Sequence, residues 1–130
     1  MHDQRPANQR SWLEKFRDAF HGVKEGVWGQ RSFFVHFTVA ALVILIAAVL
    51  QTDTLAEWGV LLLCITVVLT AEMFNSALES MARAITREVD PHVGTALDIG
   101  SGAVLIASIG AAVTGVAILV NRLGLLAGWW

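Results

Sequence analysis

Charged side chains are scarce in this sequence of 130 residues. Asp, Glu, Lys and Arg make up 15% of it, against about 25% in ordinary soluble domains. Hydrophobic residues make up 55%, and the formal net charge of −2 is too small to indicate a nucleic-acid partner. This balance excludes an ordinary soluble domain and favours a membrane protein of a single domain.

Cysteine is nearly absent. Cys64 is the one cysteine and lies within an apolar run, so an intrachain disulfide is impossible and a zinc site is unsupported. We interpret Cys64 as a small residue facing lipid or the protein core. The first thirty residues also lack an apolar stretch with a small-residue cleavage site. We therefore expect the chain to keep its first segment and to insert through its own helices.

Three long apolar runs dominate the rest of the chain. A transmembrane helix needs about 20 predominantly apolar residues, and only helices and closed barrels satisfy the backbone in lipid. Three runs cannot close a barrel, so the sequence predicts an all-α integral membrane fold. The predicted spans cover about residues 32–50, 56–85 and 97–121. Asp90 followed by Pro91 predicts a short turn between the second and third spans.

The segment before the first span predicts an amphipathic helix over residues 11–29. Apolar residues recur there at helical spacing with charged residues on the other faces, a pattern typical of a helix lying in the membrane interface. Ser11 and Glu14 have the spacing of a capping box. Several glycines weaken the helix. Residues 1–10 are polar, and we expect them to be disordered.

Basic residues predict the orientation. Six of the nine Lys and Arg residues precede the first span, and the segment 51–57 has none. Arg83 and Arg87 lie between the second and third spans. Because cytoplasmic loops carry an excess of basic residues, we expect the N-terminus and this second loop to be cytoplasmic.

A polar face near the end of the second span is the most informative feature. Its members are Glu72, Asn75, Ser76 and Glu79. Their spacing places them on one side of a helix, and Arg83 continues that side by one turn. Intramembrane acids by default face a protein interior or an aqueous cleft. Since up-down topology brings the start of the third span near the end of the second, we expect Asp98 to approach Glu79 and Arg83.

Two chemical roles suit carboxylates beside an amide. Mg²⁺ is usually held by one or two carboxylates plus substrate phosphates, and a desolvated Glu is suited to general-base work. The face is alternatively a polar seam that fixes helix packing, or part of an ion- or proton-coupled transport element. We interpret His36, one turn inside the first span, as a hydrogen-bonding residue at headgroup level, with titration or metal binding left open.

The run AEMFNSALE, residues 71–79, resembles the signature of the prokaryotic diacylglycerol kinase family, which includes undecaprenol kinases. The stretch RSFFVH that ends at His36 and the stretch DIGSGAVLIA that begins at Asp98 extend the resemblance. It implies a multi-pass homotrimer in the bacterial inner membrane. Such an enzyme transfers the γ-phosphoryl group of ATP, with Mg²⁺, to the hydroxyl of a membrane lipid, either diacylglycerol or undecaprenol.

The resemblance also implies roles for individual residues. Glu72 is expected to be the general base on the lipid hydroxyl, and Glu79 a Mg²⁺ ligand. Asn75 and Asp98 are expected to orient the phosphates, with Lys24 as a further phosphate-binding residue.

Three positions depart from the family pattern. Gln30 stands where the family has a second metal-binding Glu; it keeps a carbonyl oxygen as a metal ligand but brings no charge. Arg83 replaces an Asp, and Leu97 replaces a phosphate-binding Lys. Our hypothesis is that Arg83 supplies the missing cation from the neighbouring helix. The departures also support an alternative, a non-catalytic scaffold or regulatory member of the same fold.

Overall fold

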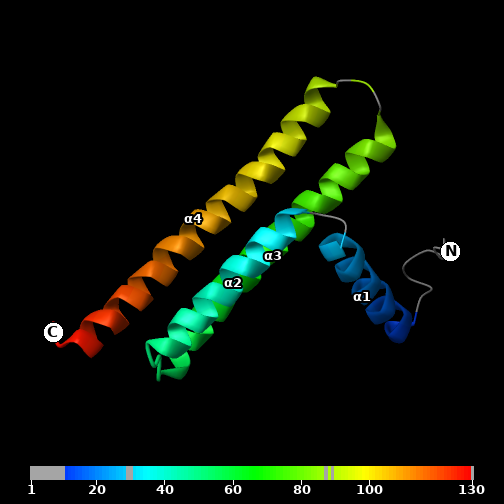
Figure 1. Ribbon diagram of the computed structural model, residues 1–130. Coiled ribbons are helices and arrows are strands. Elements are labelled where there is room, and N and C mark those ends of the chain that lie inside the picture. The colour runs from blue at the N-terminus through cyan, green and yellow to red at the C-terminus, as the bar shows by residue number, and fades with distance from the viewer. Residues whose placement is uncertain (1–10, 29–30, 87, 89, 130) are drawn as a thin grey trace.

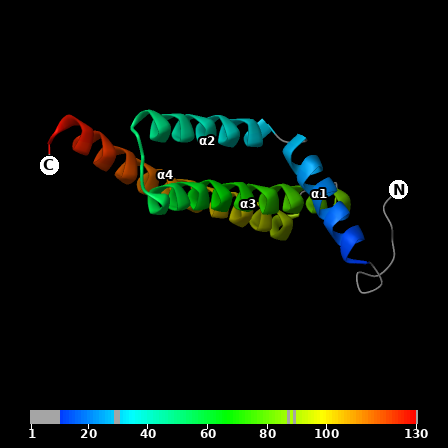
Figure 2. The ribbon, with the colours of Figure 1, turned by 90° about the horizontal axis from the view of Figure 1, so that it is seen from below.

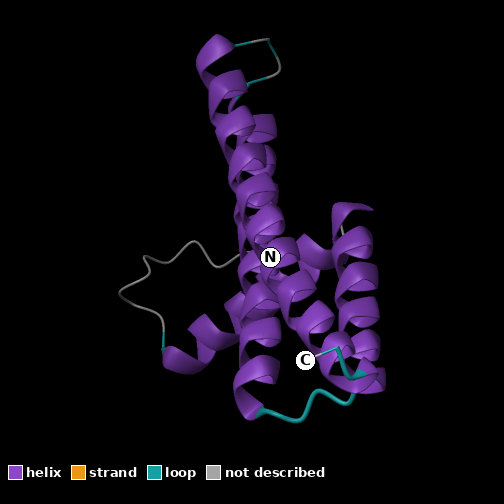
Figure 3. Cartoon of the chain, turned by 90° about the vertical axis from the view of Figure 1, so that its left-hand side faces the viewer, coloured by secondary structure: helices purple, strands orange, loops and turns teal. Residues whose placement is uncertain are grey.

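The computed structural model describes residues 11–28, 31–86, 88 and 90–129, which form four helices and no strand (Figures 1 and 3). The helices are α1 (Trp12–Trp28), α2 (Arg31–Val49), α3 (Leu55–Ile85) and α4 (Pro91–Ala127). The last three are long and apolar enough to cross a membrane. The prediction of an all-α fold with three spans after a short amphipathic helix is therefore confirmed. The disorder predicted for residues 1–10 concerns residues outside the described part.

The helix α1 begins with the capping box that the sequence predicts. The backbone N–H of Ser11 donates to Oε2 of Glu14 (2.7 Å), and the N–H of Glu14 donates to Oγ of Ser11 (3.3 Å). The glycines do not interrupt the helix. Gly26 lets α1 approach α3 closely, because a Cβ atom there would lie 2.6 Å from Sδ of Met73. This contact brings α1 next to the polar face of α3.

The helices α3 and α4 run antiparallel, side by side, and make the most extensive contact in the protein (Figure 1). Near the α3–α4 loop, a Cβ atom at Gly100 would lie 2.6 Å from Oδ1 of Asn75. Near the other end, a Cβ atom at Gly115 would lie 3.9 Å from Cδ2 of Leu61. Small residues at these positions allow the two backbones to approach. The helix α2 lies to one side of the pair and packs mainly on α3 (Figure 2).

The helix α4 begins before residue 97, where the third span was expected to start. Asp90 caps it, since Oδ1 accepts hydrogen bonds from the N–H groups of His92 (2.8 Å) and Val93 (3.1 Å). Pro91 follows at the first position of the helix, where its missing N–H costs nothing. Pro91 therefore opens the helix instead of lying in the predicted turn.

The helix α2 is about as long as a membrane is thick, whereas α3 and α4 are longer. With a rise of 1.5 Å per residue, α2 measures about 28 Å, α3 about 46 Å and α4 about 55 Å. The hydrocarbon core of a membrane is about 30 Å thick. The helix α2 thus matches one bilayer, whereas the α3–α4 pair is long enough to extend beyond it.

Candidate functional site

The polar face predicted on the second span lies on α3, and most of it is buried. Only 4% of Glu72, 8% of Asn75 and 6% of Ser76 is exposed. Glu79 follows and is half-buried. The burial of Glu72, Asn75 and Ser76 places their polar groups inside the protein rather than against lipid, and half-buried Glu79 continues the same side of the helix.

The contacts within this face leave some polar atoms without partners. Nδ2 of Asn75 donates to Oε1 of Glu79 (3.1 Å), and Nη1 of Arg83 lies 3.7 Å from Oε2 of Glu79. Oδ1 of Asn75 and Oγ of Ser76 are buried and have no hydrogen-bond partner among the described residues. An unsatisfied buried polar group costs about 1–3 kcal/mol. Atoms left in this state are suited to bind a ligand that supplies the missing partner.

A second helix completes the surroundings of Glu72. Nε2 of His36, on α2, lies 3.7 Å from Oε2 of Glu72, with 20% and 5% of the two side chains exposed. Of the basic side chains in the described part, only His36 comes within ion-pair distance of this carboxylate. The acid and its partner are thus held by different helices and meet through the packing of α2 on α3.

The oxygen donors of the face fit a magnesium ion that is completed by phosphates. A carboxylate at Glu79 and the unpartnered amide oxygen of Asn75 are ligands of the kind that Mg²⁺ prefers. Within residues 11–28, 31–86, 88 and 90–129, no group of three His, Cys, Asp or Glu side chains is arranged to hold a metal. Among the described residues of this face, Glu79 and Asn75 are therefore two that offer oxygen atoms to a metal.

An apolar cavity of about 470 Å³ opens between α2, α3 and α4. Because neighbouring helices run antiparallel, the first lining residues of α2 and α4 lie beside the last lining residues of α3. One end of the cavity is therefore lined by His36, Leu69 and Ser108, and the other end by Val43 and Leu119. Leu69 lies about one helical turn before Glu72. The cavity thus leads from the middle of the apolar region to the pair of His36 and Glu72.

Residues 17–119 match the family model described as prokaryotic diacylglycerol kinase. The chain belongs to this family. Since the family consists of lipid kinases and three helices can span a membrane, the protein is a multi-pass membrane enzyme with kinase activity. ATP is the phosphoryl donor expected of that class.

Characterised relatives are similar over most of their lengths. The undecaprenol kinase of Bacillus subtilis (strain 168) is 28% identical over 120 residues, 89% of this chain and 97% of that protein. The diacylglycerol kinase of Synechocystis sp. is 31% identical over 126 residues, 92% of this chain and 71% of that protein. The diacylglycerol kinase of Helicobacter pylori (strain J99) is 28% identical over 104 residues, 78% of this chain and 80% of that protein. No solved structure gives a significant match.

The structure of this kinase brings only some of the predicted site residues together. Glu72, Asn75, Glu79 and Arg83 lie along one helix, as described above. Asp98 is exposed on α4 and makes no hydrogen bond or ion pair with the described residues, and its expected approach to Glu79 and Arg83 stays a prediction. Lys24 is likewise exposed on α1, without an ion pair to any described side chain. Gln30 lies outside the described residues.

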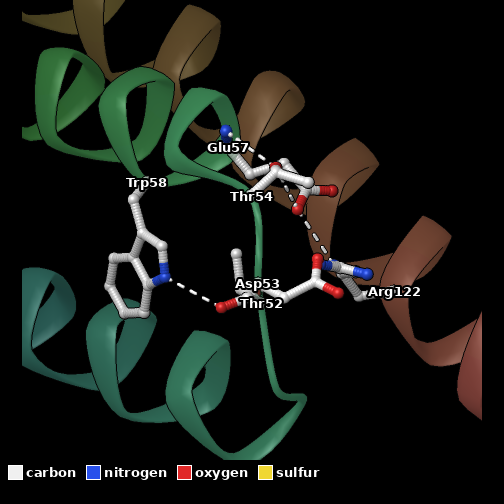
Figure 4. A network of polar contacts seen from close by, with 6 residues as sticks. All are labelled: Thr52, Asp53, Thr54, Glu57, Trp58 and Arg122. Atoms are coloured by element: carbon white, nitrogen blue, oxygen red, sulfur yellow. Dashed lines mark hydrogen bonds and ion pairs between the residues drawn. The ribbon is translucent and has the colours of Figure 1, made fainter.

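The kinase also holds a polar network at the other end of α3 (Figure 4). Arg122 of α4 forms ion pairs with Asp53 and with Glu57, where Nε lies 2.9 Å from Oε2 of Glu57. Oγ1 of Thr54 donates to the same carboxylate (2.7 Å), and Nε1 of Trp58 donates to the backbone oxygen of Thr52 (2.9 Å). These contacts tie the α2–α3 loop to α4.

The sequence analysis missed two of these relationships. It placed His36 at headgroup level without linking it to Glu72, since only the packing of α2 on α3 brings them together. It left Arg122 unassigned, although Arg122 was predictable as a partner. A lone cation near the end of the third span faces the acidic 51–57 segment in any up-down topology.

Proposed function

We propose that this kinase transfers the γ-phosphoryl group of ATP to the hydroxyl of a membrane lipid, diacylglycerol or undecaprenol. The observation that carries the proposal is a buried carboxylate, Glu72, that lies 3.7 Å from His36 in the lining of an apolar cavity and about one helical turn beyond Leu69 in the same lining. The cavity offers a hydrocarbon chain an apolar lining close to an acid. Such a site is suited to an alcohol with a long apolar tail.

The lipid side of the reaction is assigned to Glu72. Its carboxylate accepts the proton of the lipid hydroxyl as the hydroxyl oxygen bonds to the γ-phosphorus of ATP. The bond from the γ-phosphorus to the bridging oxygen breaks, and ADP leaves. The cavity side chains hold the lipid chain, so that its hydroxyl stays at the acid. Phosphoryl transfer relies on such positioning and on charge stabilisation more than on covalent chemistry.

The nucleotide side is assigned to the part of the face nearer the α3–α4 loop. Glu79 and Gln30 would hold Mg²⁺ together with the phosphates, and the ion when bound would neutralise charge on the transferring group. Asn75 offers its unpartnered Oδ1 to this assembly. Asp98 on α4 and Lys24 on α1 are exposed, and we assign them to the phosphates from the family resemblance.

We further propose that the N-terminus and the α3–α4 loop face the cytoplasm, across a bacterial inner membrane. The proposal rests on the basic residues before α2 and on the need of the site for cytoplasmic ATP. A homotrimer is proposed from the family resemblance. Its support here is that α4 leaves most of its apolar length uncovered within one chain, available to other copies.

Purified protein in detergent, given ATP, Mg²⁺ and either diacylglycerol or undecaprenol, tests the activity. We expect labelled phosphate in one of the lipids. The Glu72→Gln variant is expected to lower turnover by about 10²- to 10⁴-fold, the usual contribution of a general base. Folded wild-type protein that phosphorylates neither lipid would favour a scaffold instead. Ion flux through liposomes without ATP would favour transport.

A further inference from the structure

His36 is the polar side chain that the proposed chemistry leaves without a role, although it lines the cavity and faces Glu72. It stands on α2, about one turn from the start of that helix. Its neighbours in the cavity lining, Val35 and Val39, are apolar. A polar ring at this position is costly unless it serves the carboxylate that it faces.

No other polar side chain of the described part contacts the Glu72 carboxylate by a hydrogen bond or ion pair. The amide nitrogen of Asn75 is used by Glu79, and Oγ of Ser76 has no hydrogen-bond partner among the described residues. The side chain of Glu72 is 95% buried, and its carboxylate can rotate about the side-chain bonds. A fixed partner is therefore needed to present one oxygen to a substrate. Within the described chain, the imidazole of His36 is the side chain placed to do so.

We infer that His36 is a positioning residue for the general base. Through Nε2 it holds Oε2 of Glu72, which leaves the other carboxylate oxygen available to accept the lipid proton. The contact of 3.7 Å is longer than a hydrogen bond. Catalytic contacts of this kind often tighten only when substrate is bound. The inference rests on the proposed function, because it assigns His36 a role in that same reaction.

A purely structural role for His36 makes different predictions from a positioning role. If the ring only joined α2 to α3, its loss would lower the stability of the protein and affect every kinetic parameter. If it positions Glu72, its loss lowers kcat and leaves the KM for ATP unchanged, because the nucleotide binds further along α3. Gln is the informative replacement, since its amide nitrogen reaches about the position of imidazole Nε2 and donates without titrating.

The test measures kcat, the KM for ATP and thermal unfolding of the full chain in detergent with its lipid substrate. We expect His36→Leu to lower kcat by about 10- to 100-fold, the scale of a misplaced catalytic group, with the KM for ATP within about two-fold. His36→Gln is expected to recover kcat to within about five-fold of wild type. Phe34→Leu is the matched control, because Phe34 is 78% exposed on the same helix and does not line the cavity.

Three results would overturn the inference. They are full kcat in His36→Leu, a Gln variant as slow as the Leu variant, and a loss of activity that merely follows a loss of thermal stability. Failure of the proposed function is distinguishable from all three, because the wild-type protein would then phosphorylate no lipid. If wild type is active and Glu72→Gln is not, only the role of His36 is at issue.

Discussion

The helix α3 carries two polar clusters, one at its start and one from its middle toward the α3–α4 loop, and their charged groups are paired to different extents. Near the α2–α3 loop, Glu57 and Asp53 face Arg122, so the cation has a carboxylate on two sides (Figure 4). In the second cluster, His36 is the one basic side chain of the described part that faces Glu72, and Asn75 keeps a buried oxygen without a partner among the described residues. In the first cluster the charges of Arg122, Asp53 and Glu57 are paired with one another, although Oγ1 of Thr52 is buried without a hydrogen-bond partner among the described residues. The second lacks partners that a substrate can supply, which is the pattern expected of a functional site.

The spacing of the two clusters fits their different roles. Along α3, Glu72 lies about 22 Å and Glu79 about 33 Å from Glu57, by the rise per residue of an α-helix. A hydrocarbon core of about 30 Å therefore fits between Glu57 and Glu79. In that placement Glu72 lies about 9 Å inside the boundary on the side of Glu79. The acid is thus nearer the side on which the nucleotide is proposed to bind.

The largest expected effect comes from making the same substitution in both clusters. Glu72→Gln should lower kcat by about 10²- to 10⁴-fold, because a general base is lost, with little change in thermal unfolding. Glu57→Gln should leave kcat within about two-fold and lower stability by less than about 1 kcal/mol, since Gln still accepts from Thr54. Turnover and unfolding of the two variants in the same detergent provide the comparison. Equal losses of kcat would show that the clusters do not differ in function.

The next prediction concerns Gly100→Ala and tests the role of the unpartnered oxygen of Asn75. A Cβ atom at Gly100 would lie 2.6 Å from that oxygen, so Gly100→Ala must displace the Asn75 side chain. We expect kcat to fall by about 10- to 100-fold, as for other small displacements of catalytic groups. Gly102→Ala, on the same helix with no atom within 4 Å of its Cβ, is the matched control and should keep its activity. Equal activity of the two variants would remove Asn75 from the site.

The sequence predicted much of the fold but only one side of the site. Apolar run lengths predicted three spanning helices, and the spacing of Glu72, Asn75 and Glu79 predicted their common face, because both depend on positions within one helix. The contact of Glu72 with His36 depends on how two helices pack, which periodicity within each helix does not determine. The start of α4 was misjudged for a local reason. Pro91 was taken as part of a turn, although a capped helix accepts proline at its first position.

A smaller effect, on stability alone, is expected in the cluster around Arg122. Arg122→Leu removes the cation between Asp53 and Glu57, of whose side chains 72% and 20% is exposed. The loss should be about 2 kcal/mol, below the full cost of breaking a buried pair because Asp53 is screened by solvent. Thermal unfolding in detergent measures it, while kcat per folded molecule should not change. Adding Glu57→Gln to Arg122→Leu should recover part of the loss. A fall in kcat without a fall in stability would mean that this cluster also serves the reaction.

The smallest effect is expected at Arg83, at the edge of the cluster that contains Glu72. Arg83 is 67% exposed and pairs with Glu79 at 3.7 Å, so an exposed pair contributes at most about 1 kcal/mol. If Arg83 supplies the phosphate-binding cation that Leu97 cannot, Arg83→Ala should raise the KM for ATP by up to about five-fold and leave kcat unchanged. Because salt screens exposed charges, the difference from wild type should shrink as ionic strength rises. Arg83→Lys, which keeps the charge, should retain most of the affinity. If Arg83→Ala has the KM for ATP of wild type at low salt, Arg83 does not replace the lysine that the family has at the position of Leu97.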